Sequence, residues 1–112
     1  MIDSYSFGEI TVDGTGYRSD VILFPQRVVA DWWRESGHRL VLKDLEEVLS
    51  YGPGVLIVGQ GKFGRMKVDS EVRAEAHRRG IELFAAPTDR AVEEYNRRSG
   101  EGRVVAALHL TC

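Results

Sequence analysis

A glycine-rich loop after a hydrophobic strand is the part of this sequence whose residues could most directly do chemistry. Residues 55–58 are all aliphatic, and residues 59–64 read G-Q-G-K-F-G. The pattern G-x-G-x-x-G after a strand is typical of dinucleotide-binding proteins, in which glycine lets the backbone approach a pyrophosphate. The loop is therefore the first place to look for a ligand site.

Two features of the following sequence argue against a dinucleotide. In a true fingerprint the third glycine already lies on the helix that holds the pyrophosphate, and an acid after the next strand binds the ribose. Here the loop continues through residues 65–68, the next helix is expected to start at Asp69-Ser70, and the following strand ends at Phe84-Ala85-Ala86-Pro87 without an acid. We therefore predict that the chain binds neither NAD nor FAD, and we assign it no cofactor.

The loop is nevertheless locally cationic. No acidic residue lies between Glu47 and Asp69, and this interval contains Lys62, Arg65 and Lys67. Glycine-rich backbone can turn its N–H groups toward an anion, so a small anion is one candidate ligand. The alternative is that the glycines only permit positive φ in a tight turn, with the basic side chains solvated. The candidate ligand-binding residues are Gly59, Gln60, Gly61, Lys62 and Arg65.

The remaining reactive residues do not form a recognisable catalytic or metal site. His109 and Cys112 are close in sequence, but in an extended strand they face opposite sides, whereas an activated thiol needs the imidazole within hydrogen-bond reach. The three histidines lie in separate segments without a local metal-binding spacing. The acids Asp20 and Asp31 lie in segments rich in β-forming residues and could be functional or structural. We predict no catalytic residue, no metal site and no enzymatic activity.

The charge distribution argues against nucleic-acid and membrane partners. Lys and Arg number 15 and Asp and Glu 17, a net charge of -2, so no global field attracts a polyanion. The pairs Arg78-Arg79 and Arg97-Arg98 precede Gly80 and Gly100, where cations complement a helix dipole. No apolar run approaches the roughly 20 residues that a bilayer requires, and no secretion signal is recognisable. With a single cysteine, these features predict a soluble cytoplasmic protein.

The N-terminal third is expected to be mostly β-structure. Ile10 and Val12 alternate with polar residues, residues 13–16 form a turn, and residues 21–24 return as the second strand of a hairpin before Pro25. Another β-rich piece covers 28–33. It contains Trp32 and Trp33, whose rings would face opposite sides of a strand, so that one packs in the core and the other lies nearer the surface. A surface tryptophan is a candidate partner contact; the alternative is that it covers its own hairpin.

The remainder alternates helices and strands. Helices are expected from Lys43 to the stop at Gly52-Pro53, from an Asp69-Ser70 cap to Gly80, and from a Thr88 cap to Gly100. Strands are expected at 55–58, 81–84 and 103–110. Helical crossovers between neighbouring strands favour parallel pairing. At 112 residues the chain fits one α/β domain, 1–112, with a mixed, largely parallel central sheet and an N-terminal hairpin.

Several of these segments together resemble a known family, the Mth-type domain family. The similarity covers nearly the whole chain, and its specific parts are T-x-x-A-V-x-x-Y-N at 88–96 and H-x-T-C at 109–112; the other segments are 55–61, 66–68, 80–81 and 106–108. The family includes the adipogenesis-associated domain protein and a mitochondrial respiratory complex I assembly factor. Gln60 stands where many members have threonine.

The resemblance implies a three-layer α/β fold around a mixed sheet of about five strands. It implies no settled reaction, and no catalytic residues can be carried over. The eukaryotic members look like assembly or regulatory factors, which implies a protein-binding role. A mitochondrial location does not carry over, because no Arg- and Ser-rich presequence precedes Ser6-Phe7-Gly8.

Two hypotheses of function remain. The first is a non-enzymatic interaction or assembly domain with an unidentified protein partner or a second copy of the chain, in a homodimer. The alternative is a protein that binds an anionic ligand at Gly59–Arg65. An interaction domain should expose an apolar or aromatic patch, whereas a ligand site should be a concave pocket with converging polar groups.

Overall fold

A mixed five-stranded sheet forms the centre of the computed structural model, which describes all residues from Met1 to Cys112. The strand order is β5-β4-β10-β7-β9. Strand β7 is parallel to both of its neighbours, β10 and β9, and β4 is antiparallel to both β10 and β5. The bounds are β4 (Val21–Phe24), β5 (Arg27–Val29), β7 (Val55–Gln60), β9 (Glu82–Ala86) and β10 (Val104–His109). The predicted α/β class and mixed sheet are confirmed.

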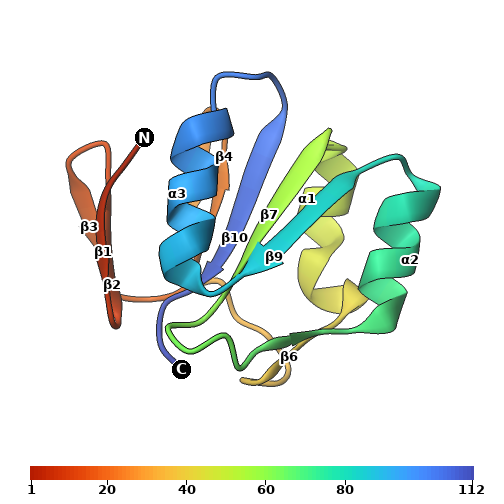
Figure 1. The fold of residues 1–112 in the computed structure, drawn as a ribbon, viewed down its shortest axis with the longest axis horizontal. Coiled ribbons are helices and arrows are strands. Elements are labelled where there is room, and N and C mark those ends of the chain that lie inside the picture. Colours follow the sequence, from red (N-terminus) through yellow and green to blue (C-terminus); the bar gives the residue numbers. More distant parts are fainter.

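Helices cover both faces of this sheet (Figure 1). On one face lie α1 (Glu46–Tyr51), which continues from the 3-10 turn η1 (Leu42–Leu45), and α2 (Ser70–Arg78); on the other face lies α3 (Thr88–Arg98). Three helices are therefore present where the hydrophobic periodicity predicted them. Each face has its own apolar core, in which Val48, Val72 and Ala76 pack on one side and Ala91 and Tyr95 on the other. No helix is long and apolar enough to cross a membrane.

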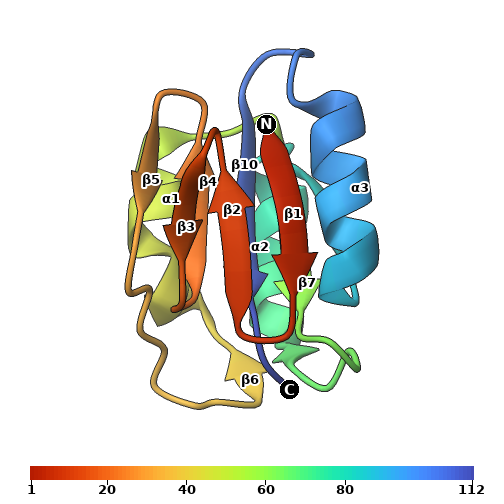
Figure 2. The ribbon, with the colours of Figure 1, turned by 90° about the vertical axis from the view of Figure 1, so that its left-hand side faces the viewer.

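A second, three-stranded sheet lies beside α3 and covers the rest of that face (Figure 2). It consists of β1 (Ile2–Ser6), β2 (Glu9–Val12) and β3 (Thr15–Tyr17), all antiparallel. Ile2, Ile10 and Val12 are buried against the central sheet. A short parallel ladder joins β6 (Arg39–Leu40) to β8 (Lys67–Val68).

The predicted pairing of 10–12 with 21–24 is wrong. The chain turns at Asp13-Gly14, with φ of 47° and 83°, and β2 pairs with the short strand β3 instead. Strand β4 belongs to the central sheet, where it pairs with β10 and β5. All four of its residues are buried, which suits a strand covered on both faces and not an exposed hairpin.

Two other local predictions also need correction. The β-rich segment 28–33 ends as a strand at Val29, so Trp32 and Trp33 lie in a loop. Thr88 is the first residue of α3, whose N-cap is Pro87. The Thr88 hydroxyl donates to the His109 carbonyl at 2.6 Å and accepts from the Gly61 amide at 2.9 Å. It therefore joins three parts of the structure and does not cap its own helix.

Candidate functional site

The carboxyl ends of β7, β9 and β10 meet at one edge of the sheet, because these strands are parallel. After β7 the chain enters a helix on one face, and after β9 it enters a helix on the other face. In open α/β sheets the crevice between two such strands is the usual ligand site. The glycine-rich loop follows β7 directly at this position.

In this protein the chain itself fills that crevice. Gly61 bonds Thr88 twice, through its N–H to the hydroxyl at 2.9 Å and through its carbonyl to the Thr88 amide at 3.0 Å. A Cβ on Gly64 would lie 3.2 Å from Pro87 Cγ, and one on Gly59 only 2.8 Å from Thr88 Oγ1. Because Gly59 and Gly64 have no side chain, the loop can pack against the residues that follow β9. This close packing explains why glycine occupies these positions, and the explanation requires no ligand.

Most polar groups of the loop are also occupied. The Lys62 amide donates to the Thr111 carbonyl at 2.8 Å, and the Gln60 side chain donates to the Met66 carbonyl at 2.9 Å. The Lys62 ammonium pairs with Asp89 at 3.1 Å. The amides of Phe63 and Arg65 make no hydrogen bond within the chain. The four grooves of the surface are lined by other residues, so binding of an anion by Gly59–Arg65 stays a prediction.

This packing sharpens the expectation for dinucleotides. A bound pyrophosphate needs an open crevice and a free helix N-terminus. In this protein Pro87 and Thr88, at the N-terminus of α3, pack against the glycine-rich loop and fill that space. Calorimetric titration with NAD or FAD is expected to show no binding tighter than the millimolar range, where the affinity is only about 4 kcal/mol. A micromolar dissociation constant for either compound would contradict this prediction.

A buried polar cluster lies beside the loop. Asp20 immediately precedes β4. Its Oδ2 accepts a hydrogen bond from Arg34 Nη1 at 2.5 Å and lies 2.8 Å from His109 Nδ1. Its Oδ1 accepts the Leu110 amide at 2.8 Å. The side chain of Arg34 is only 5% exposed, and its Nε makes no hydrogen bond. We call Asp20, Arg34 and His109 the edge cluster.

The hydrogen position on His109 follows from the partners of Nδ1. Arg34 Nη2 lies 3.1 Å from Nδ1, but a guanidinium can only donate. The carboxylate of Asp20, which is closer at 2.8 Å, can only accept, so the Nδ1–Asp20 hydrogen bond requires the hydrogen on Nδ1; Arg34 Nη2 then makes no hydrogen bond to that nitrogen. Nε2 makes no hydrogen bond within the chain. An Asp-His pair can orient a catalytic base, but a base needs room for a substrate. His109 lines none of the four grooves of the surface.

The charge of Asp20 depends on these partners. Burial acts to raise the pKa of Asp20, but hydrogen bonds from His109, Arg34 and the Leu110 amide outweigh it, and the pKa lies below its usual value. The carboxylate is therefore ionised at neutral pH and neutralises the Arg34 guanidinium. This compensation is what permits a buried arginine.

The edge cluster holds the loop that carries the two tryptophans. Trp32 is 8% exposed; its amide donates to the Asp20 carbonyl at 2.9 Å, its indole N–H donates to the Asp44 carbonyl at 3.0 Å, and Arg34 lies over its ring. Trp33 is 79% exposed. The expectation of one buried and one exposed tryptophan is confirmed, although the segment is not a strand. These contacts anchor the chain on both sides of Trp33, whose own ring is exposed.

Two further exposed aromatic residues lie at the same edge of the molecule. Phe7 (54% exposed) precedes Gly8, whose amide donates to the Leu110 carbonyl, and Phe63 (64% exposed) follows Lys62, which bonds Thr111. Figures 1 and 2 both place the loops of Phe7, Trp33 and Phe63 around the end of β10. Arg65 and Lys67 lie nearby and make no ion pair. We call Phe7, Trp33, Phe63, Arg65 and Lys67 the carboxyl-edge surface.

The other candidates from the sequence are separated. Cys112 is exposed and makes no hydrogen bond with His109, whose ring faces Asp20. No group of three or more His, Cys, Asp or Glu side chains is arranged to hold a metal ion. Asp31 lies in an exposed turn with a φ of 56°. Local sequence patterns single out Asp20 and His109 without bringing them together, and they give no reason to place Arg34, Phe7 or Phe63 in a site. One signal was available in the sequence: Asp20 precedes one strongly apolar strand, and His109 ends another.

Comparison with known proteins adds a family and a set of similar structures. The family model described as "Protein of unknown function (DUF498/DUF598)" matches residues 2–110. The conserved hypothetical protein PH1505 from Pyrococcus horikoshii OT3 is 25% identical with a TM-score of 0.85, covering 100% of this chain and 99% of that one. A structure described as MT938 is 27% identical with a TM-score of 0.81, covering 100% and 98%.

A third similar structure is that of a Bordetella pertussis protein described as a Mth938-like domain. It is 20% identical with a TM-score of 0.71, and the match covers 98% of this chain and 85% of that chain. At this identity the likeness shows the fold alone. Together with MT938, it agrees with the Mth-type resemblance of the sequence, which is confirmed.

Proposed function

Because the chain belongs to the DUF498/DUF598 family of proteins of unknown function, the family supplies no activity, and we propose a function from the site itself: a non-enzymatic interaction domain. The carboxyl-edge surface binds a protein partner, which can be another protein in an assembly or a second copy of this chain. The single observation that carries this proposal is the exposure of Phe7, Trp33 and Phe63 on loops around the end of one strand.

Exposed aromatic side chains are costly to leave in water and are enriched at the centres of protein interfaces. Trp33 lies between Trp32, which bonds the Asp20 and Asp44 carbonyls, and Arg34, which bonds the Asp20 carboxylate. A loop whose backbone is already positioned loses less entropy on binding. The filled crevice at the sheet edge also supports an interface in preference to a substrate pocket.

The unpaired charges of the carboxyl-edge surface indicate which charges the partner should carry. Lys62 and Arg39 are paired with Asp89 and Asp69, which leaves Arg65 and Lys67 without an acidic partner. The Arg65 guanidinium lies 5.7 Å from the Phe63 ring centroid. The complementary surface would therefore offer an apolar pocket for aromatic rings with carboxylates at its rim.

Photo-crosslinking tests the proposal. A photoreactive amino acid is placed at position 33 or 63, and the control carries it at Glu93, an exposed position on α3. The same partner is expected to crosslink from 33 and 63 but not from 93. Excess unlabelled wild-type protein should compete for the partner and prevent the crosslink. The Trp33→Ala/Phe63→Ala variant should compete at least about 30-fold less well, because loss of an interface hot spot costs about 2 kcal/mol of binding free energy.

The outcomes separate the alternatives. Equal crosslinking from position 93, or equal competition by the double variant, would contradict the proposed surface. Crosslinks to a second copy, together with a dimer in solution, would make the interface a homodimer. Both substituted side chains are exposed, so the melting temperature of the double variant should stay within about 2 °C of the wild type.

Binding of a small anion at Gly59, Gln60, Gly61, Lys62 and Arg65 is the second candidate function. It is favoured by the unbonded amides of Phe63 and Arg65 beside the unpaired Arg65 guanidinium. A chemical-shift titration with phosphate and sulfate should then move the signals of these amides, and Arg65→Ala should weaken binding about 5- to 150-fold. Shifts that cluster elsewhere would remove this candidate.

A further inference from the structure

One edge of the central sheet has no neighbouring strand. Strand β9 ends the order β5-β4-β10-β7-β9, and in Figure 1 it is the nearest strand of the sheet, with no segment crossing in front of it. The Glu82 amide donates to the Gly54 carbonyl at 2.9 Å, and the parallel register with β7 continues unbroken to Ala86. Along a strand the backbone groups of successive residues point to opposite sides. The amide and carbonyl groups of Leu83 and Ala85 therefore point away from β7, toward the open edge.

Nothing in the sequence of β9 protects this edge against pairing. The other edge strand, β5, is only three residues long and begins at Arg27, which pairs with Glu47. Short length and charge are two common ways in which proteins blunt a sheet edge. Strand β9 has five residues, and after Glu82 it contains no charge, proline or bulge. Residues 83–85 are apolar and partly exposed, so a further strand would cover them.

Helix α2 places an exposed arginine beside this edge. Val72 and Ala76 face the core, and Glu75 lines a groove toward α1. At 3.6 residues per turn, Arg73 lies on the flank of α2 opposite α1. Helix α1 packs near β4, whereas α2 packs on β9. The Arg73 flank therefore faces the open edge.

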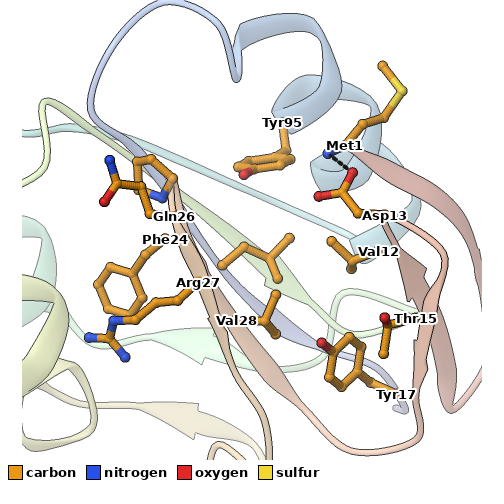
Figure 3. Close-up of a pocket in the computed structure, with 12 residues that line it drawn as sticks. Met1, Val12, Asp13, Thr15, Tyr17, Phe24, Gln26, Arg27, Val28 and Tyr95 are labelled. Carbon is orange, nitrogen blue, oxygen red and sulfur yellow. Dashed lines mark hydrogen bonds and ion pairs between the residues drawn. The ribbon is translucent and has the colours of Figure 1, made fainter.

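Helix α3 places a second exposed arginine on the other face of the same edge. One flank of α3 faces the three-stranded sheet, because Asn96 bonds the amide and carbonyl of Ile2 at 2.8 Å; Figure 3 shows the groove between these two parts. The opposite flank faces β9, since Arg98 pairs with Glu82 at 2.6 Å. Arg90 lies about two turns before Arg98 on this side. Arg90, like the arginine of α2, makes no ion pair.

These two charges indicate what the edge would bind. Helices α2 and α3 directly precede and follow β9, so their first turns, with Arg73 and Arg90, lie toward its carboxyl end on opposite faces. A strand added to β9 projects successive side chains to opposite faces. We propose that the edge of β9 binds an extended peptide segment of another protein, in which two consecutive acidic residues reach these arginines. None of the residues of this site belongs to the carboxyl-edge surface.

The charges also disfavour a second copy of the chain as the occupant. Antiparallel pairing of two β9 strands keeps the same face of each sheet on the same side. It would bring two Arg73 flanks together, and like charges at an interface oppose association.

The probe for the test is the peptide E-E-T-V-T-V-E-E, which is acidic at both ends so that either strand direction brings an acidic pair to the arginines. Amide exchange in the protein is followed by NMR during the titration. At saturation the amides of Leu83 and Ala85 should exchange at least about tenfold more slowly. Those of Phe84 and Ala86 already point toward β7 and should not change. The same peptide with its middle amides N-methylated keeps its charge but cannot donate to β9, so it should not bind.

Substitutions separate the contribution of charge from that of the backbone. The Arg73→Ala/Arg90→Ala variant should bind the peptide about tenfold more weakly, the effect of losing two exposed ion pairs. The control Arg78→Ala, also exposed on α2 but paired with Glu75, should bind as the wild type does. Ala85→Pro removes an outward amide at an edge position that tolerates proline, and it should abolish binding.

Several results would overturn the proposal. These are the absence of saturable changes up to about 1 mM peptide, protection of amides elsewhere than in β9, or equal binding of the N-methylated peptide or of the basic peptide K-K-T-V-T-V-K-K. A dimer in solution that protects the Leu83 and Ala85 amides without peptide would also overturn it, because a second copy would then occupy the edge.

Discussion

Replacement of Asp20 with alanine is expected to lower the free energy of unfolding by about 3–5 kcal/mol. The substitution leaves the Arg34 guanidinium, 5% exposed, without a counter-charge, and the Leu110 amide without an acceptor. His109 Nδ1 loses its partner as well. Each of these groups would remain buried and unpaired, which costs far more than the loss of an exposed ion pair.

Urea unfolding followed by tryptophan fluorescence measures this effect. The matched control is Asp89→Ala, because Asp89 forms an ion pair with Lys62 at 3.1 Å but is half exposed. An exposed pair contributes about 1 kcal/mol or less, so the control should stay close to the wild type. Equal destabilisation of the two variants would contradict the assignment of the edge cluster as a buried compensated unit.

The same residue predicts a pH dependence. The pKa of Asp20 is lower in the folded protein than its usual value of 3.8, so the unfolded state binds the proton more readily. Its contribution to stability is complete above the unfolded pKa and is lost as the pH falls through the folded pKa. Between pH 6 and pH 3 the wild type should therefore lose more stability than Asp20→Ala. Other carboxylates titrate in both proteins, so the difference isolates Asp20.

Hydrophobic patterning predicted the central elements well because each is specified locally. The aliphatic strand β7 and the striped helix α3 carry their signals within a few residues. The N-terminal pairing was mispredicted because the short strand β3, with the sequence Thr15-Gly16-Tyr17, has little apolar content. The more strongly apolar run at Val21–Phe24 predicts the wrong partner for β2, because burial on both faces is the property of a central strand.

The edge cluster could not be predicted from local patterns. Asp20 and His109 are separated by 89 residues, and Arg34 and His109 by 75. Their meeting depends on the antiparallel pairing of β4 with β10, which places the start of one strand beside the end of the other. Thr88 shows the same limit, since its position favours a helix cap but its hydroxyl bonds Gly61 and His109. Tertiary pairing decides the role of these polar residues.

Gly61→Ala is the second substitution with a large expected effect, and it tests why the loop contains glycine. Gly61 has a φ of 94°, in a region that residues with a Cβ rarely adopt. A Cβ there would lie 2.7 Å from the Thr111 carbonyl oxygen, 2.9 Å from His109 Cδ2 and 3.0 Å from the Cys112 carbonyl oxygen. Two of these three atoms are backbone atoms, which cannot rotate away as a side chain can.

We therefore expect Gly61→Ala to destabilise the protein by about 2–5 kcal/mol, through backbone strain of about 1–2 kcal/mol and overpacking of about 1–3 kcal/mol. Gly100→Ala is the control, because no atom lies within 4 Å of its Cβ position and its φ is not positive; it should stay within about 0.5 kcal/mol of the wild type. If the glycine served only to admit an anion, Gly61→Ala would fold as stably as the control and lose only phosphate binding. A loss of stability without any ligand present would instead place the reason for Gly61 in its contact with the end of β10, the same contact that fixes the carboxyl-edge surface.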